Sequence, residues 1–81
     1  IMLNNLYVRC NAMITLDQIQ IRIAEAIKQS GMSQTAIAKA LNIKPTQICS
    51  YLKGRKFPAL DTLANLCKLL DVDANFILCQ D

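Results

Sequence analysis

The chain has 81 residues, which is enough for one hydrophobic core and too short for two independent domains. Apolar residues make up 53% of it, yet no uninterrupted apolar run approaches the roughly 18 residues that a membrane-spanning helix needs. The formal net charge of +3 is modest and does not by itself identify a nucleic-acid partner. The composition therefore favours one small globular domain without a membrane partner.

The cysteines do not form a recognisable site. There are four of them and no histidine, and their spacing does not match a zinc site, so we expect no metal and no cofactor. Three of them fall in helical patterns that already explain their burial or exposure, and this favours reduced thiols over a disulfide framework. With no secretory leader in view, the protein is expected to be cytoplasmic. The cysteines are Cys10, Cys49, Cys67 and Cys79.

Residues 1–12 stand apart from the rest of the chain. Between Asn5 and Met13 the sequence resembles a widely used tag-removal site followed by a short linker and a native start. Residues 5–7 and 11–12 match that pattern, whereas residues 8–10 depart from it. We expect residues 1–12 to be vector-derived and residues 13–81 to form the natural domain. A natural N-terminal arm is the alternative.

The first predicted helix begins with Thr15–Gln18, which has the form of a capping box. Ser30-Gly31 ends it. Between them, apolar residues recur at the spacing of an amphipathic helix. They are Leu16, Ile19, Ile23, Ala26 and Ile27.

Residues 33–54 predict two short helices joined by a tight turn. Ser33 is suited to cap the first helix, and the apolar side chains at residues 37, 38 and 41 recur at helical spacing. Asn42 tolerates the left-handed backbone that a sharp turn requires. Pro45 suits the first position of a new helix, because its missing amide proton would be unpaired there anyway. This layout is a helix-turn-helix, which indicates duplex DNA rather than catalysis.

The second of these helices, residues 45–53, has two unlike sides. At 3.6 residues per turn, the apolar side carries Ile48, Tyr51 and Leu52, and Gly54 ends the helix. Gln47 lies on the flank. The opposite side carries Thr46, Cys49, Ser50 and Lys53.

Two more helices are predicted near the C-terminus, from about Leu60 to Leu70 and just after a capping Asp73. The last helix contains Phe76, Ile77 and Leu78. No segment alternates as a strand does, so the sequence predicts an all-α fold of five helices. The apolar face of the longer helix is expected to consist of Leu60, Leu63, Ala64, Cys67 and Leu70.

At these residues the chain resembles the phage-repressor family of lambda-repressor-like, Cro-type helix-turn-helix domains. The likeness extends from about Leu16 to Leu78 and implies a five-helix, lambda-repressor-like fold that binds duplex DNA. Asn42, Lys44 and Ala59 depart from the family pattern, so the helices that follow Lys44 and Ala59 are expected to be less well capped. The matching segments are Ser33-Gln34, Ile37-Ala38, Leu41–Ile43, Ile48-Cys49, Tyr51, Lys53-Gly54 and Lys56–Leu63.

Charge is distributed unevenly along the chain. No acidic residue lies between Ala26 and Leu60, whereas six basic residues do. The helix at 45–53 is bracketed by Lys44 before it and by Lys53, Arg55 and Lys56 at its other end. Phosphates flank a major groove in the same way, so these four residues are predicted to bind phosphates. An ordinary solvated basic surface is the alternative. The resemblance also implies a phosphate contact or a supporting role for Gln34, which could equally be a solvated polar residue.

Four residues on the helix at 45–53 are predicted to contact bases. The Gln47 amide both donates and accepts, which suits adenine N6 and N7, and the Thr46 methyl can pack on a thymine methyl. Ser50 is short and permits close approach, and Pro45 is expected to contact a sugar or methyl group. The alternatives are that the polar residues are simply exposed and that Pro45 has only its backbone role.

We therefore predict a sequence-specific, double-stranded-DNA-binding transcriptional regulator, a repressor of phage, plasmid or mobile-element type, that enters the major groove with residues 45–53. Because one unit contacts few base pairs, we expect a homodimer on an inverted repeat with half-sites roughly 34 Å apart. One set of apolar residues has two alternative roles, a contact surface between the two copies or packing within one chain. These are Leu66, Leu69, Phe76, Ile77 and Leu78.

Two alternatives belong to other functional classes. One is a protein-interaction module of the same fold, such as an antitoxin or adaptor, but such a module has no need of an acid-free basic window. The other is an enzyme, which we do not expect, because the chain has no histidine, no glycine-rich phosphate loop and no carboxylate pair at helical spacing. No small-molecule ligand is evident.

Overall fold

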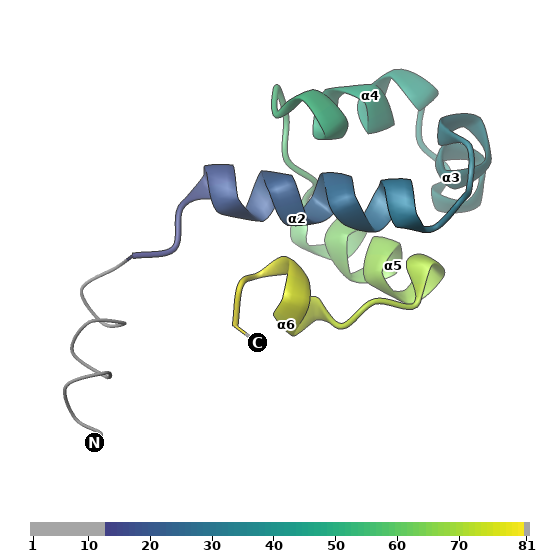
Figure 1. Ribbon diagram of the computed structural model, residues 1–81. Helices are drawn as coiled ribbons and strands as arrows, with labels where there is room; N and C mark the ends of the chain where they lie inside the picture. The colour runs from purple at the N-terminus through teal and green to yellow at the C-terminus, as the bar shows by residue number, and fades with distance from the viewer. Residues whose placement is uncertain (1–12, 81) are drawn as a thin grey trace, which may run out of the picture.

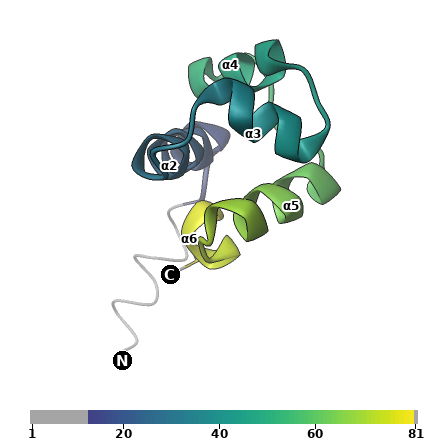
Figure 2. The ribbon, with the colours of Figure 1, turned by 90° about the vertical axis from the view of Figure 1, so that its right-hand side faces the viewer.

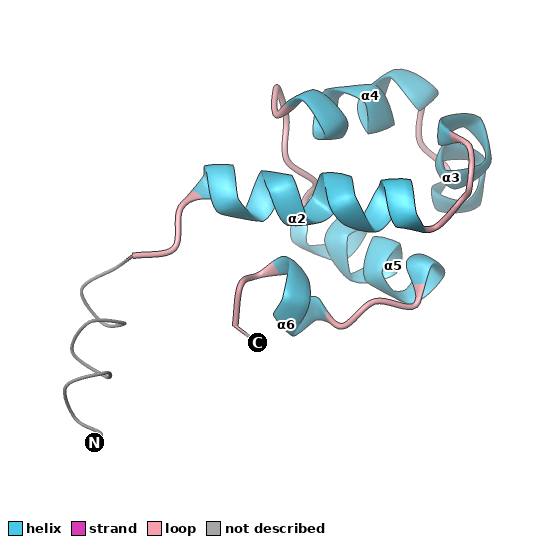
Figure 3. Cartoon of the chain, viewed as in Figure 1, coloured by secondary structure: helices cyan, strands magenta, loops and turns pink. Residues whose placement is uncertain are grey.

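The computed structural model describes residues 13–80; residues 1–12, which we expect to be vector-derived, and residue 81 lie outside that part. The described residues are helices joined by short loops, with no strand among them (Figure 3). The predicted all-α fold of five helices is therefore confirmed. The helices are α2 (Leu16–Gln29), α3 (Gln34–Leu41), α4 (Pro45–Lys53), α5 (Leu60–Leu70) and α6 (Ala74–Ile77).

The longest helix, α2, crosses the middle of the domain. It packs against α4 on one side and against the short α6 on the other (Figure 1). Helix α3 packs against both α4 and α5 and lies between them in the perpendicular view (Figure 2). Helix α4 is thus held from below by two helices, α2 and α3, and its remaining side faces away from the domain.

Every helix contributes a large and fully buried side chain to a common core. Each of these five residues is at most 1% exposed, and burying an aliphatic side chain of this size stabilises a fold by about 1.5–3 kcal/mol. The core therefore links all five helices, and α4 cannot turn about its axis without exposing its own contribution. The five residues are Ile23, Ile37, Ile48, Leu66 and Ile77.

The predicted apolar face of α5 is wrong in part. Leu60 is 86% exposed and Ala64 is exposed, whereas Leu66 is only 1% exposed. The buried face is shifted toward Leu66, because contact with α3 and not the local pattern decides which side is covered. Leu16, predicted for the core, is 62% exposed. Like Leu60, it is the first residue of its helix and lies at the rim of the core.

Two of the five residues for which a dimer surface is an alternative belong to the core of the same chain. Leu66 and Ile77 are each 1% exposed, so intramolecular packing is the correct interpretation for both. Leu69 and Phe76 are half-buried against the core, and Leu78 is 38% exposed.

Side-chain caps form where the sequence predicts them. The side-chain oxygens of Thr15, Ser33 and Asp73 accept hydrogen bonds from backbone amides two or three residues further on. Lys44 and Ala59, which depart from the family pattern, make no such bond. The weaker capping expected for α4 and α5 is therefore present.

Helix α6 is held against α2 by one arginine. Arg22 Nη1 donates to the Phe76 carbonyl oxygen over 2.8 Å, and the guanidinium lies 4.5 Å from the centroid of the Phe76 ring. Both contacts stabilise a helix too short to persist alone. Among residues 13–80, no helix has the length and apolar character needed to cross a bilayer.

Candidate nucleic-acid interface

The turn between α3 and α4 follows from three local features of the backbone. Asn42 adopts the left-handed conformation, with φ 57° and ψ 44°. The Ile43 amide donates to the Ala38 carbonyl oxygen over 2.9 Å, which closes the end of α3. Lys44 is extended, with φ −81° and ψ 144°, and Pro45 then occupies the first position of α4. The predicted roles of Asn42 and Pro45 in the backbone are confirmed.

Helix α4 buries one side and presents the other. Ile48 is 0% exposed and Tyr51 is 5% exposed, in agreement with their predicted place on the apolar side. Burial raises the pKa of the Tyr51 hydroxyl above its usual value, so this group stays neutral. Thr46 and Lys53 are exposed on the opposite side, as predicted. The beginning and end of α4 are thus accessible to a ligand.

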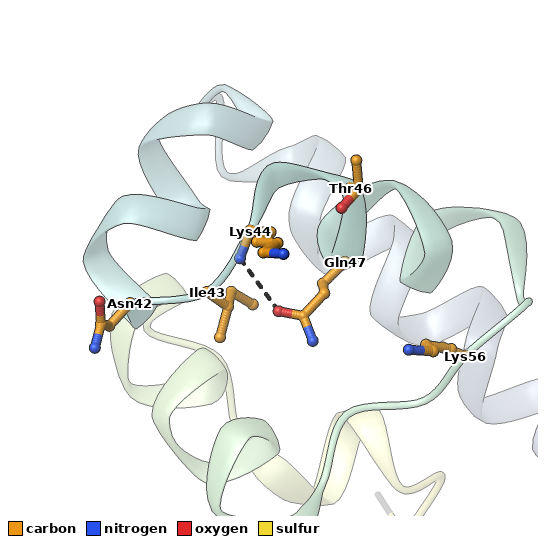
Figure 4. Close-up of a pocket in the computed structure, with 6 residues that line it drawn as sticks. All are labelled: Asn42, Ile43, Lys44, Thr46, Gln47 and Lys56. Atoms are coloured by element: carbon orange, nitrogen blue, oxygen red, sulfur yellow. Dashed lines mark hydrogen bonds between the residues drawn. The ribbon is translucent and has the colours of Figure 1, made fainter.

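An open groove of about 640 Å³ lies beside the beginning of α4. It brings together four predicted site residues, Lys44, Thr46, Gln47 and Lys56, although Lys56 belongs to the loop after α4. Gln47 lies between Lys44 and Lys56, whereas Thr46 points away from Gln47 (Figure 4). Asn42 and Ile43 complete the lining.

The Gln47 amide has one end engaged by the protein itself. Its Oε1 accepts a hydrogen bond from the Lys44 backbone amide over 3.2 Å (Figure 4). Gln47 is the third residue of α4, so this bond is the second half of a capping box whose first half, a serine or threonine hydroxyl, is missing at Lys44. The Nε2 end points away from Lys44 N and carries two hydrogens.

Ser50 also has an internal partner. Its hydroxyl donates to the carbonyl oxygen of Thr46, one turn earlier in α4, over 3.1 Å. A serine hydroxyl has one hydrogen, and here the hydrogen is used within the helix. The side chain is half-buried, so Ser50 is less accessible than the neighbouring Thr46.

The C-terminal end of α4 is held by a residue that the sequence did not single out. Gln20 Nε2, on α2, donates to the Leu52 carbonyl oxygen over 2.7 Å and contacts that of Tyr51 at 3.5 Å. Gly54, with φ 75°, ends α4 as predicted, and a Cβ there would lie 3.2 Å from Gln20 Cγ. Gln20 therefore fixes the end of α4, and no local signal reveals it because it lies 32 residues before Leu52.

The other predicted site residues lie outside the groove. Gln34 is the first residue of α3 and is exposed. Pro45 and Lys53, at the two ends of α4, and Arg55, in the loop that follows, are exposed as well. Their contacts with DNA remain predictions.

This surface suits a polyanion. Lys44 and Lys56 flank the groove at one end of α4, and Lys53 and Arg55 lie at the other end. No acidic residue occurs between residues 26 and 60, so no carboxylate from this stretch opposes them. Cations spaced along an exposed helix in this way attract phosphates on both sides of a nucleic-acid groove.

Comparison with known proteins gives one match. The family model described as Helix-turn-helix matches residues 23–77, from α2 to α6, which is more than half of the 81-residue chain. No curated protein and no solved structure matches it. The matched segment contains α3, the turn at Asn42 and α4, so the chain belongs to the lambda-repressor-like, Xre-type helix-turn-helix family of DNA-binding proteins.

Proposed function

We propose that this protein is a cytoplasmic, sequence-specific transcriptional regulator that represses genes of a phage, a plasmid or another mobile element. In this proposal residues 13–81 act as one domain, and α4 enters the major groove of double-stranded DNA. One observation carries it: α4 buries Ile48 and Tyr51 while its beginning, with Thr46 exposed and Gln47 half-buried, adjoins a groove flanked by lysines.

The size of α4 supports this docking. The major groove is about 12 Å wide and admits an α-helix, whose diameter with side chains is about 10–12 Å. Helix α4 has nine residues, so about 13 Å of helix can lie in the groove. In this pose Thr46, Gln47, Ser50 and Pro45 approach the bases. The phosphate contacts come from Gln34, Lys44, Lys53, Arg55 and Lys56.

A homodimer on an inverted repeat is the second part of the proposal. One α4 contacts only a few base pairs, so high specificity calls for two copies about one helical turn apart. With Leu66 and Ile77 in the core, the apolar residues left for contact between copies near the C-terminus are Leu69, Phe76 and Leu78. Sedimentation of the protein with and without its DNA site tests this part, and a complex of one chain per site would contradict it.

The decisive experiment is selection of bound sequences from a random duplex pool at near-physiological salt. We expect an enriched inverted repeat, and a gene placed downstream of it should be expressed less when the protein is present. A pool that stays random after repeated selection, with folded protein, would refute sequence-specific binding.

The second candidate is a protein-interaction module such as an antitoxin or adaptor. It is favoured by apolar side chains at the beginning of α2, where Leu16 is 62% exposed and Ile21 is 55% exposed. On this hypothesis Leu16→Ser and Ile21→Ser would abolish the biological effect while binding to DNA persists. If the effect instead follows DNA binding in all variants, this candidate is excluded.

A further inference from the structure

Two polar side chains of α4 have their hydrogen-bonding direction set before any DNA arrives. The Lys44 backbone amide is a donor, so the atom of Gln47 that lies 3.2 Å from it must be the amide oxygen and not the nitrogen. Because this bond caps the start of α4, the oxygen is held toward Lys44. The end of the side chain that faces the groove is then Nε2, which only donates.

Ser50, one turn further along α4, is restricted in the opposite sense, to accepting. Ser50 donates its single hydroxyl hydrogen to the Thr46 carbonyl oxygen over 3.1 Å. The Ser50 oxygen keeps its lone pairs, so toward an outside partner it acts as an acceptor. Gln47 and Ser50 are three residues apart and lie on neighbouring turns of the same helix.

We propose that Gln47 contacts a guanine only by donating hydrogen bonds to it. We further propose that Ser50 accepts a hydrogen bond from the exocyclic amino group of an adenine or a cytosine in the adjoining step. This inference rests on the proposed function, since it presupposes that α4 enters the major groove. It replaces a two-sided adenine contact of Gln47, which would need both Oε1 and Nε2 to face the same base edge.

The base edges in the major groove differ in how well they suit a side chain that only donates. In the major groove guanine presents two acceptors, N7 and O6, which match the two hydrogens on Nε2. Thymine offers one acceptor beside a methyl group, and the amino hydrogens of adenine and cytosine would oppose those of Nε2. Guanine is therefore the best partner for a donor-only glutamine.

The surroundings of Gln47 favour the same base. Lys44 and Lys56 line the groove on either side of it, and both carry a positive charge (Figure 4). The paired acceptors of guanine attract such cations, whereas an amino group in the same place would be repelled.

The test compares base preferences of the wild-type protein with those of Gln47→Ala, Gln47→Glu and Ser50→Ala. Each protein is used to select duplexes from one random pool, after its thermal melting shows that it is folded. Gln47→Glu is the matched control for the cap, since its carboxylate can still accept from Lys44 N but cannot donate. We expect Gln47→Ala to melt at a lower temperature than Gln47→Glu.

The expected results identify each contact separately. Gln47→Ala should relax one position that is guanine for the wild type, with a loss of about 5- to 150-fold on that site. 7-Deazaguanine at this position should weaken the wild type and leave Gln47→Ala unaffected. Gln47→Glu should move the preference toward cytosine, and Ser50→Ala should relax an adjacent adenine or cytosine.

Three results would overturn the inference while sparing the proposed function. They are an adenine at the position relaxed by Gln47→Ala, a uniform loss over all sequences, which would make Gln47 a phosphate ligand, and unchanged preferences in Ser50→Ala. If the wild-type protein itself enriches no sequence, the proposed function fails and this inference fails with it.

Discussion

Replacement of Lys56 by glutamine tests whether the cations around α4 bind phosphates. Each phosphate contact contributes about 0.9 to the slope of log Kobs against log salt. A homodimer carries two copies of Lys56, so Lys56→Gln should lower the slope by about 1.8. A threefold rise in salt should then weaken the variant about sevenfold less than the wild type.

The matched control is Lys68→Gln, which removes the same charge from an exposed position on α5. Helix α3 lies between α5 and α4, so Lys68 is not expected to contact the same duplex (Figure 2). Binding is measured by fluorescence anisotropy on the selected duplex and on a scrambled one, at several salt concentrations. Equal slopes for the wild type and Lys56→Gln would refute the phosphate role of Lys56. A slope lowered equally by Lys68→Gln would show that only net charge matters.

Four further predictions follow from the packing and the caps. Ile48 is 0% exposed, so in urea denaturation Ile48→Val should lower the free energy of unfolding by about 0.5–1.5 kcal/mol and Ile48→Ala by about 2–5 kcal/mol; equal losses would contradict close packing under α4. Asn42→Ala should be less stable than Asn42→Gly by about 1–2 kcal/mol, because only glycine adopts φ 57° without strain; identical melting of the two would refute this. Gln20→Ala should cost about 0.5–1.5 kcal/mol of stability and also weaken binding to the selected duplex, and unchanged affinity would show that Gln20 does not position α4. Cys67 should resist iodoacetamide at pH 8 in the folded protein while half-buried Cys49 reacts, since burial and, less strongly, Asp73 raise the pKa of the Cys67 thiol; peptide mass spectrometry showing equal rates would refute it.

The boundaries of the helices and the turn between α3 and α4 were predictable because the interactions that make them are local. The caps at Thr15, Ser33 and Asp73 join atoms no more than three residues apart. The left-handed residue Asn42 and the hydrogen bonds around it lie within five residues of one another. Such features depend on residue type and spacing, which the chain itself displays.

The hydrogen bond of Gln47 is local as well, yet it was not predicted. The bond from Lys44 N to Gln47 Oε1 spans three residues, so its pattern was present in the sequence. It was not predicted because a capping box is recognised by serine or threonine at its first position, and Lys44 occupies that position here. The adenine contact predicted for Gln47 was drawn without this bond, and the base that Gln47 contacts stays a prediction.

The sequence by itself determined the all-α class, the limits of its helices, the turn before α4 and the basic character of residues 26–60, because each depends on neighbours along the chain. Only the tertiary structure decided which face of α5 is covered, that Gln20 holds the end of α4, and that Lys44 and Lys56 flank one groove with Gln47 between them. These three depend on how helices distant in sequence pack around Ile23, Ile37 and Ile48, and burial of a shared core is a property of the whole chain rather than of any one segment.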